Sequence, residues 1–238
     1  MKLTTTNKPI YMAATVAFAA FLLTSLTTEA VVHPGVKILE ARFDSREVVK
    51  IEAGDFHFKP GQIAPIHTHS APAIGIVTKG AILYQVEGEK PQLLTKGDAF
   101  HEPVGPRILR FDNASATEEA IFVDFNLQQE GEPFIVFPEP LKEVIDRRTL
   151  PTVEMTGQAI QQVNVHSIDL ESLEKTVVAS SLPTLGWVTA GAIEIHSNDS
   201  ASQRVSAGQS FAISTPNSAT LMNPSRELTA SIVTFELH

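Results

Sequence analysis

The feature that most constrains this chain is an internal duplication with an offset of 111 residues. Three pairs of glycines have this separation: Gly75 and Gly186, Gly80 and Gly191, Gly97 and Gly208. The run IGIVTKGAI at 74–82 returns as LGWVTAGAI at 185–193, and KGDAF at 96–100 returns as AGQSF at 207–211. A sequence that repeats itself over most of its length predicts two copies of one structural module.

Each copy consists of short apolar or alternating runs separated by Gly, Pro, Asn and Asp. AILYQVEGEKPQLLTKGDAF and AIEIHSNDSASQRVSAGQSF each predict a strand, a polar turn and a second strand. Many short strands at this spacing are typical of an all-β sandwich or barrel. We therefore expect a β-barrel in each half, with Trp187, which aligns with Ile76, filling the second one.

The duplication divides the chain into an N-terminal module at 31–127 and a C-terminal module at 163–238. A connector at 128–162 is interrupted by prolines, and its segment EPLKEVIDRRTLP is the one stretch of the connector that predicts a short helix. A further helical turn is expected at 171–175, ESLEK.

The first thirty residues predict an export signal. Lys2 and Lys8 precede an apolar run at 10–26, and Thr28-Glu29-Ala30 supplies small residues at a cleavage site. The apolar run is long for a signal peptide, so an uncleaved membrane anchor is the alternative. Both interpretations predict an exported protein, periplasmic or extracellular, and only the anchor implies a membrane partner.

Composition excludes several classes of function. The net charge is -9 and no basic stripe is present, so nucleic acid is not an expected partner. The chain has no cysteine, which excludes disulfides, thiolate nucleophiles and cysteine metal sites. Any metal ion must therefore be held by nitrogen and oxygen atoms.

The candidate chemistry lies in GQIAPIHTHSAPAIGIVTKG at 61–80. Residues two apart in an extended strand point to the same side, so His67 and His69 should converge on one face. Two converging imidazoles predict part of a metal site. The alternative is a polar pocket in which both histidines bind an organic anion without a metal.

These residues resemble the cupin superfamily. Its first motif contains Gly, His-x-His, Glu and Gly, and here Gly61, His67, His69 and Gly80 have that spacing, while Ala73 stands at the Glu position. The resemblance covers 49–127 and, through the repeat, 163–237. It implies two tandem cupin-type (double-stranded β-helix, jelly-roll) barrels, that is, a bicupin.

The second cupin motif is less complete. Gly97, Pro103 and Gly105 match it, but Ile108 stands at the His position and Asp112 at the Asn position, with Asn113 one residue further. Cupins typically hold Fe, Mn, Ni or Zn with three histidines and a glutamate, so the resemblance implies a divalent metal with only two of the four ligands kept.

Replacement ligands are available on neighbouring strands. His101 and Glu102 are adjacent and must face opposite sides, so one of them can reach the cavity. Tyr84 and Gln85 offer the same choice as ligand-binding residues, and His57 could approach the rim. In the second copy Val178, Ser180 and Thr184 stand where the first copy has His67, His69 and Ala73, so that half is not expected to bind metal.

Three functions remain open. The first is an exported protein that binds a small polar ligand, such as a sugar acid or another carboxylate, in the N-terminal barrel, with or without metal on His67 and His69. The second is a metal-dependent oxygenase, isomerase or lyase. The third is a non-catalytic structural or oligomerisation module, and the resemblance implies a homo-oligomer in every case.

Overall fold

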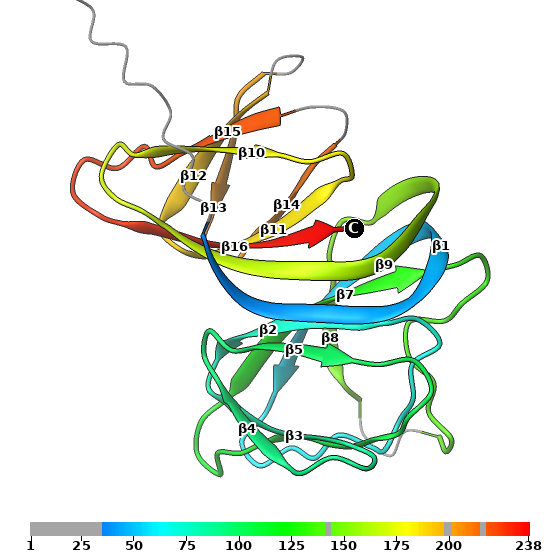
Figure 1. Cartoon of the computed structure of the whole chain (residues 1–238). Helices are drawn as coiled ribbons and strands as arrows, with labels where there is room; N and C mark the ends of the chain where they lie inside the picture. The colour runs from blue at the N-terminus through cyan, green and yellow to red at the C-terminus, as the bar shows by residue number, and fades with distance from the viewer. Residues whose placement is uncertain (1–34, 141–143, 198–200, 215–217) are drawn as a thin grey trace, which may run out of the picture.

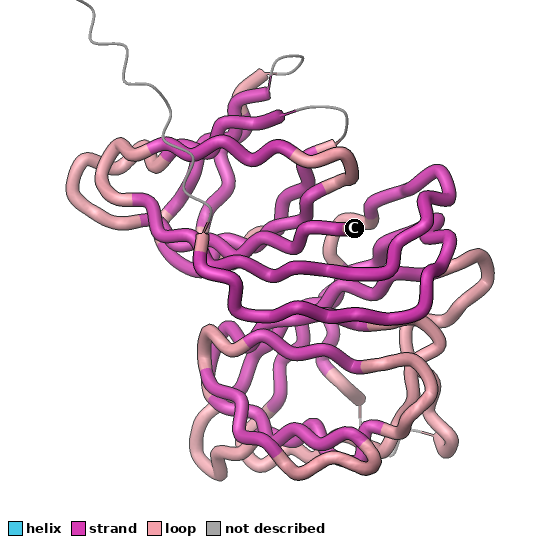
Figure 2. The backbone as a smooth tube through the Cα atoms, viewed as in Figure 1, coloured by secondary structure: helices cyan, strands magenta, loops and turns pink. Residues whose placement is uncertain are grey.

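The computed structural model describes residues 35–140, 144–197, 201–214 and 218–238. The expected signal or anchor segment at 1–30 lies outside these residues. Sixteen strands and no helix make up the regular structure of the described chain (Figure 2). The described residues therefore contain no helix that is long and apolar enough to span a membrane. The predicted all-β architecture of two jelly-roll barrels is confirmed.

The N-terminal barrel lies in the lower part of Figure 1 and is built from the first eight strands. These are β1 (Val36–Phe58), β2 (Ala73–Lys79), β3 (Ala81–Val86), β4 (Gln92–Thr95), β5 (Ala99–Glu102), β6 (Ile108–Asn113), β7 (Ala120–Gln128) and β8 (Asp146–Thr149). The C-terminal half of β1 pairs with β7, β7 with β2, and β2 with β5. The opposite wall is a three-stranded sheet in the order β4-β3-β6.

The C-terminal barrel repeats this plan in the upper part of Figure 1. Its strands are β9 (Val153–Leu170), β10 (Lys175–Ala179), β11 (Thr184–Ala190), β12 (Ala192–Ser197), β13 (Gln203–Ser206), β14 (Ser210–Ile213), β15 (Ser218–Met222) and β16 (Ala230–Leu237). The orders β14-β11-β16-β9 and β10-β15-β12-β13 give its two walls.

Two long strands join the barrels into one molecule. β1 and β9 pair antiparallel, from Val36 opposite Ser167 to Ile51 opposite Val153, with three shifts in register. This pairing connects the large sheets of both barrels into a single nine-stranded sheet. Figure 1 shows β1 and β9 running side by side between the barrels.

Side-chain alternation divides the apolar residues into three cores. Within the strands, one set fills the N-terminal barrel, including Phe100 and Phe122, and another fills the C-terminal barrel. The third set lies between the barrels and includes Phe125 and Phe235, whose ring centroids are 4.6 Å apart. Trp187 belongs to this third core, so the expectation that it fills the second barrel is wrong: its position on β11 faces the neighbouring barrel.

The connector covers the N-terminal barrel. Its residues Phe134, Ile135 and Ile145 pack onto the core of that barrel, and β8 pairs with β1. The expected helices are not formed in the described residues, because 146–149 pair as a strand and 171–174 contain only a turn. Backbone pairing with β1 outweighs the local helical preference of the connector. Residues 141–143 of the expected helix lie outside the described chain.

Candidate functional site

The two histidines are held in an extended segment just before β2. His67 exchanges backbone hydrogen bonds with Ile108 on β6 (3.4 and 2.8 Å), and Thr68 does so with Val136 of the connector (both 3.0 Å). The pairing fixes the alternation of the segment, so both imidazoles face the barrel interior as predicted. His67 is 4% exposed and His69 is 3% exposed, which removes both rings from bulk water.

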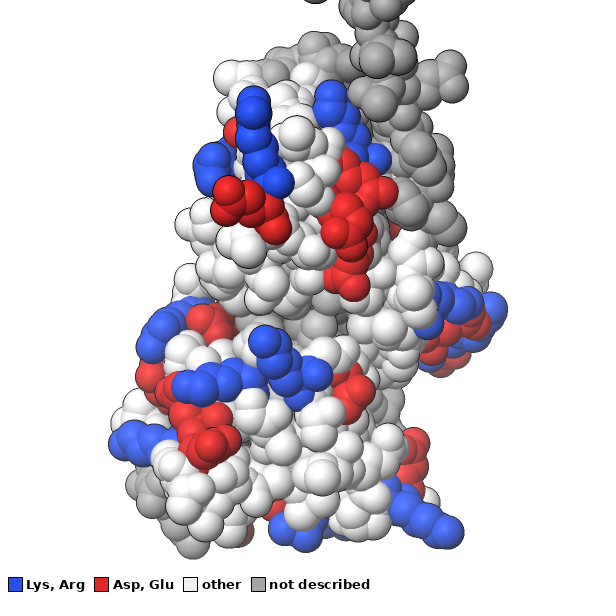
Figure 3. Space-filling view, turned by 90° about the vertical axis from the view of Figure 1, so that its left-hand side faces the viewer, with Lys and Arg blue, Asp and Glu red and all other residues white. Residues whose placement is uncertain are grey.

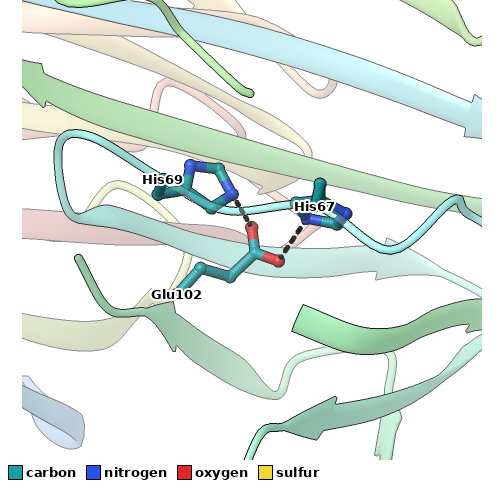
Figure 4. A group of neighbouring side chains, drawn as sticks. All are labelled: His67, His69 and Glu102. Carbon is teal, nitrogen blue, oxygen red and sulfur yellow. Dashed lines mark hydrogen bonds and ion pairs between the residues drawn. The ribbon is translucent and has the colours of Figure 1, made fainter. Parts of the chain in front are cut away.

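Glu102 completes a group of three donors. Its carboxylate lies between the two rings, with Oε1 3.3 Å from His67 Nε2 and Oε2 3.3 Å from His69 Nε2 (Figure 4). Within the described chain this is the one group of three or more potential ligand residues, and its ligand atoms all lie within 4.8 Å of one another.

Glu102 occupies the place of the glutamate that the cupin motif would supply from β2. Ala73, at the motif position, pairs directly with Glu102 on the adjacent strand β5. Paired residues on neighbouring strands project to the same face, so the carboxylate reaches the same cavity from one strand away. Of these two candidates, Glu102 is therefore the one whose side chain lies beside His67 and His69, because His101 faces the other side of β5.

Both imidazole rings turn their Nε2 atoms toward Glu102. His67 Nδ1 donates to the carbonyl of Pro65 at 2.8 Å, and its Nε2 lies 3.3 Å from Glu102 Oε1. The His69 Nε2 atom is buried and has no partner with hydrogen-bond geometry. Asn126 helps to fix the position of the His69 ring. Its Nδ2 lies 3.4 Å from His69 Nδ1 and donates to the Phe134 carbonyl at 3.0 Å. Two imidazole Nε2 atoms on either side of one buried carboxylate form a donor set of the kind that binds a divalent metal ion.

The charges of the site stabilise one another. Burial opposes ionisation of Glu102, but the neighbouring His69 and His67 outweigh it and lower its pKa to about 2. Burial likewise opposes protonation of His67, but Glu102 outweighs this and raises the pKa of that imidazole. In the absence of metal the pair therefore favours an imidazolium and a carboxylate, and a cation that binds must displace the imidazolium proton.

The other candidates from the sequence lie apart from the three donors. His101 packs beside Phe43, with ring centroids 6.2 Å apart, and burial lowers its pKa to about 4. Tyr84 is buried in the barrel, where its hydroxyl donates to the His101 carbonyl at 2.5 Å. Gln85 points to the opposite side of β3 and donates to the Glu89 carbonyl. His57, on β1, lies between Asp55 and Glu119 instead of at the cavity rim.

A small cavity adjoins the donors. It measures about 20 Å³, room for one water-sized body, and His67, Glu102 and Asp124 line it together with apolar residues. A groove of about 710 Å³ lies outside, between 61–66 and 138–140, with Arg107 in its lining. Ala64 and Ile145 line both spaces and so separate the groove from the cavity.

Sequence reasoning missed Asp124 and Asn126. Both lie on β7, in a run of alternating residues that was recognised only as a strand of the repeat. Their inward direction could have been read from that alternation, since Phe122, Asp124 and Asn126 share one face of the strand. The repeat also marks Asp124, because its partner position in the second copy is Thr234.

The comparisons agree with this geometry. Residues 47–126 match the protein-family model of the cupin domain. This match covers the N-terminal barrel, and the C-terminal barrel repeats the strand plan of that domain. A search of curated protein sequences returns no significant match.

Solved structures of similar fold include three different kinds of protein. AerE from Microcystis aeruginosa has a TM-score of 0.57 and 14% identity, over 85% of this chain and 99% of that one. A salicylate 1,2-dioxygenase from Pseudaminobacter salicylatoxidans has a TM-score of 0.57 and 13% identity, over 79% of this chain and 71% of that one. Vicilin from Capsicum annuum has a TM-score of 0.53 and 11% identity, over 79% of this chain and 76% of that one. At these identities the likeness concerns the fold.

Proposed function

We propose that the N-terminal barrel binds one divalent metal ion through His67, His69 and Glu102, and that this ion holds a small ligand bearing a carboxylate. The observation that carries the proposal is the buried cluster of two imidazoles and one carboxylate whose ligand atoms lie within 4.8 Å of one another. Two histidines and one carboxylate are the donor set typical of non-haem iron(II), and three protein donors leave positions open for an exogenous ligand.

The residues of the chain have distinct roles in this proposal. His67 and Glu102 supply donors whose charges already balance, while Pro65 and Asn126 keep the two rings in orientation. The bound ion would supply Lewis acidity toward an oxygen atom of the ligand. The apolar residues around the cavity exclude bulk water, which strengthens every charge interaction inside it.

The outer groove is the proposed place for the body of the ligand. Its volume lies within the range of small-molecule pockets, about 300–1,000 Å³. Most of its lining is apolar, and Arg107 adds a guanidinium group, although Glu87 already pairs with it. These features support a ligand with an apolar body and an anionic group.

Metal content tests the first part of the proposal. The chain from Val31 onward, purified without a histidine tag, should hold close to one Fe, Mn, Ni or Zn per molecule by plasma mass spectrometry. His67→Ala and Glu102→Gln should each weaken metal binding by at least about 100-fold, since even residues behind the ligands typically contribute 10–100-fold.

His57→Ala is the matched control, because His57 also lies between two carboxylates but on the outer side of β1. Equal metal content in the wild type and in the His67 and Glu102 variants would contradict the proposed site. Loss of metal in the His57 variant would show binding elsewhere.

A metal-dependent enzyme is the second candidate, favoured by the open positions of a three-donor site. One protein of similar fold is described as a salicylate 1,2-dioxygenase, which makes oxygen chemistry on an aromatic acid the first activity to assay. Oxygen uptake by the iron(II)-loaded chain with a panel of aromatic acids should depend on Glu102. Uptake that survives Glu102→Gln would exclude this site as its source.

Export and self-association complete the proposal. The N-terminal segment supports export, and the cupin fold supports a homo-oligomer. Cell fractionation and light scattering measure these two properties independently of the metal site.

A further inference from the structure

We propose that Asp124 binds the exogenous ligand of the metal site, its carboxyl group donating a hydrogen bond to the water-sized molecule or anion that takes an open coordination position. The inference rests on the proposed function, because it requires a metal at His67, His69 and Glu102. It adds a residue that the cupin motifs do not include, and it defines which ligands the cavity favours.

Position is the first argument. Asp124 lies in the middle of β7, where it pairs with Gly75 on β2 and with Gly54 on β1. It faces the barrel interior and lines the 20 Å³ cavity together with His67 and Glu102. It lies outside the group of donors that are within 4.8 Å of one another, so it borders the space next to the donors without being one of them.

The unmet hydrogen-bonding capacity of Asp124 is the second argument. The residue is 2% exposed, and its buried Oδ1 atom has no hydrogen-bond partner. A buried polar atom without a hydrogen-bond partner destabilises the folded protein. Because this oxygen atom lies at the wall of a cavity with room for one water-sized molecule, a molecule bound in that cavity can form the missing hydrogen bond.

The second barrel supplies an internal comparison. Both copies keep the residues that shape the barrel, such as the glycine of β2 and β11 and the phenylalanine that packs against it. The three proposed metal donors and Asp124 all differ in the C-terminal barrel. His67, His69, Glu102 and Asp124 correspond to Val178, Ser180, Ile213 and Thr234. Like the metal donors, Asp124 is not kept in the second barrel.

The charges around Asp124 determine which form it takes. Burial, followed by the negative charge of Glu102, raises the pKa of Asp124 well above its ordinary value, and Glu52 acts in the same direction. His69 and Arg147 oppose this without outweighing it. In the metal-free site these charges favour the neutral carboxyl group, which has an O–H to donate to an oxygen atom or a small anion. A bound cation acts in the opposite direction, so binding of an anion that only accepts hydrogen bonds tests whether the proton stays on Asp124.

Fluoride binding to the cobalt(II)-loaded protein tests the inference. Fluoride is close to water in size and only accepts hydrogen bonds, and cobalt(II) reports its coordination in the visible spectrum. Asp124→Leu should weaken fluoride binding by at least about tenfold, which corresponds to one lost hydrogen bond to a charged group. The cobalt(II) dissociation constant should stay within threefold of the wild type.

Two further variants keep the test decisive. Asp124→Asn restores a donor of the same shape and should recover most of the fluoride affinity. Asp124→Ala, which also removes the donor and adds no bulk, replaces the leucine variant if that one does not fold. Unchanged or tighter fluoride binding in Asp124→Leu, no fluoride binding by the cobalt(II)-loaded wild type, or a parallel loss of cobalt(II) affinity would overturn the inference. Failure of the wild type to bind cobalt(II) would instead refute the proposed metal site, and with it the inference.

Discussion

Asn113 and Asn223 hold the same turn in the two barrels. Asn113 Nδ2 donates to the carbonyls of Phe58, Lys59 and Glu118 at 2.8–3.1 Å, and its Oδ1 accepts from the backbone of Ser115. The Asn223 side chain makes the matching four bonds at 2.7–3.0 Å. One buried amide side chain thus forms hydrogen bonds with backbone groups of three segments. The spacing of the second cupin motif places this asparagine at position 112, one residue before Asn113.

Replacing either asparagine should therefore destabilise the protein. Asn113→Ala and Asn223→Ala each leave buried carbonyl groups without donors, and we expect a loss of about 2–4 kcal/mol in the free energy of unfolding for each. Urea denaturation measures the loss, with the exposed Gln92→Ala as a control that should change it by less than about 0.5 kcal/mol. A loss in only one of the two variants would contradict the equivalence of the turns.

His101 makes stability depend on pH. Burial lowers its pKa to about 4 from the ordinary 6.5, so the unfolded chain binds this proton more readily than the folded one. Stability that is present above about pH 6.5 is therefore lost as the pH falls toward 4, at about 1.4 kcal/mol per unit of pKa difference. His101→Phe should lose less stability than the wild type between pH 7 and pH 4.5.

The comparison needs urea titrations of both proteins at several pH values. Glu102, whose pKa is also lowered, adds to acid sensitivity in both and cancels in the difference. Parallel curves for wild type and His101→Phe would show that His101 is not responsible.

At the scale of the strands, close approach explains why glycine recurs at one position of β2 and β11. A Cβ atom on Gly75 would lie 2.3 Å from Phe100 Cζ and 2.4 Å from the Val123 carbonyl oxygen. On Gly186 the three nearest atoms all belong to the ring of Phe211, the closest at 2.0 Å. The first clash involves backbone, whereas the second involves one side chain.

This difference predicts that a second substitution at the neighbouring phenylalanine recovers stability to a different extent in the two barrels. Gly75→Ala and Gly186→Ala should each destabilise the protein, by about 1–3 kcal/mol or more, because a packed core resists added volume. Phe211→Leu should recover part of the loss caused by Gly186→Ala, since it removes the obstructing ring. Phe100→Leu should recover less in Gly75→Ala, because the Val123 carbonyl remains. Double-mutant cycles from thermal unfolding measure both, and equal rescue would contradict the geometry.

At the scale of the whole molecule, the two barrels share one sheet and one intervening core. β1 and β9 pair along most of their length, and residues from both barrels pack between them. On the face of the molecule shown in Figure 3, charged side chains of both signs are mixed. Cohesion between the barrels therefore comes from apolar contact and backbone pairing.

A shared core predicts cooperative unfolding. Trp187, the single tryptophan, lies in the core between the barrels, so its fluorescence reports their separation. We expect urea transitions measured by this fluorescence and by far-ultraviolet circular dichroism to coincide. Two separated transitions would show that the barrels unfold independently.

Much of this protein was determined locally and could be predicted from the sequence. The repeat at 111 residues, the alternation within short runs and the His-x-His spacing led to two β-barrels and to His67 and His69, since turns and strand periods depend on nearby residues.

Only the tertiary structure decided how those parts combine. It places Glu102, and not His101, opposite Ala73, and it brings Asp124 to the same cavity from another strand. Trp187 faces the neighbouring barrel. The connector pairs with β1 as a strand and does not fold as a helix. The physical reason is that register and facing between strands far apart in the chain depend on backbone pairing and burial across the whole sheet, which no local spacing specifies.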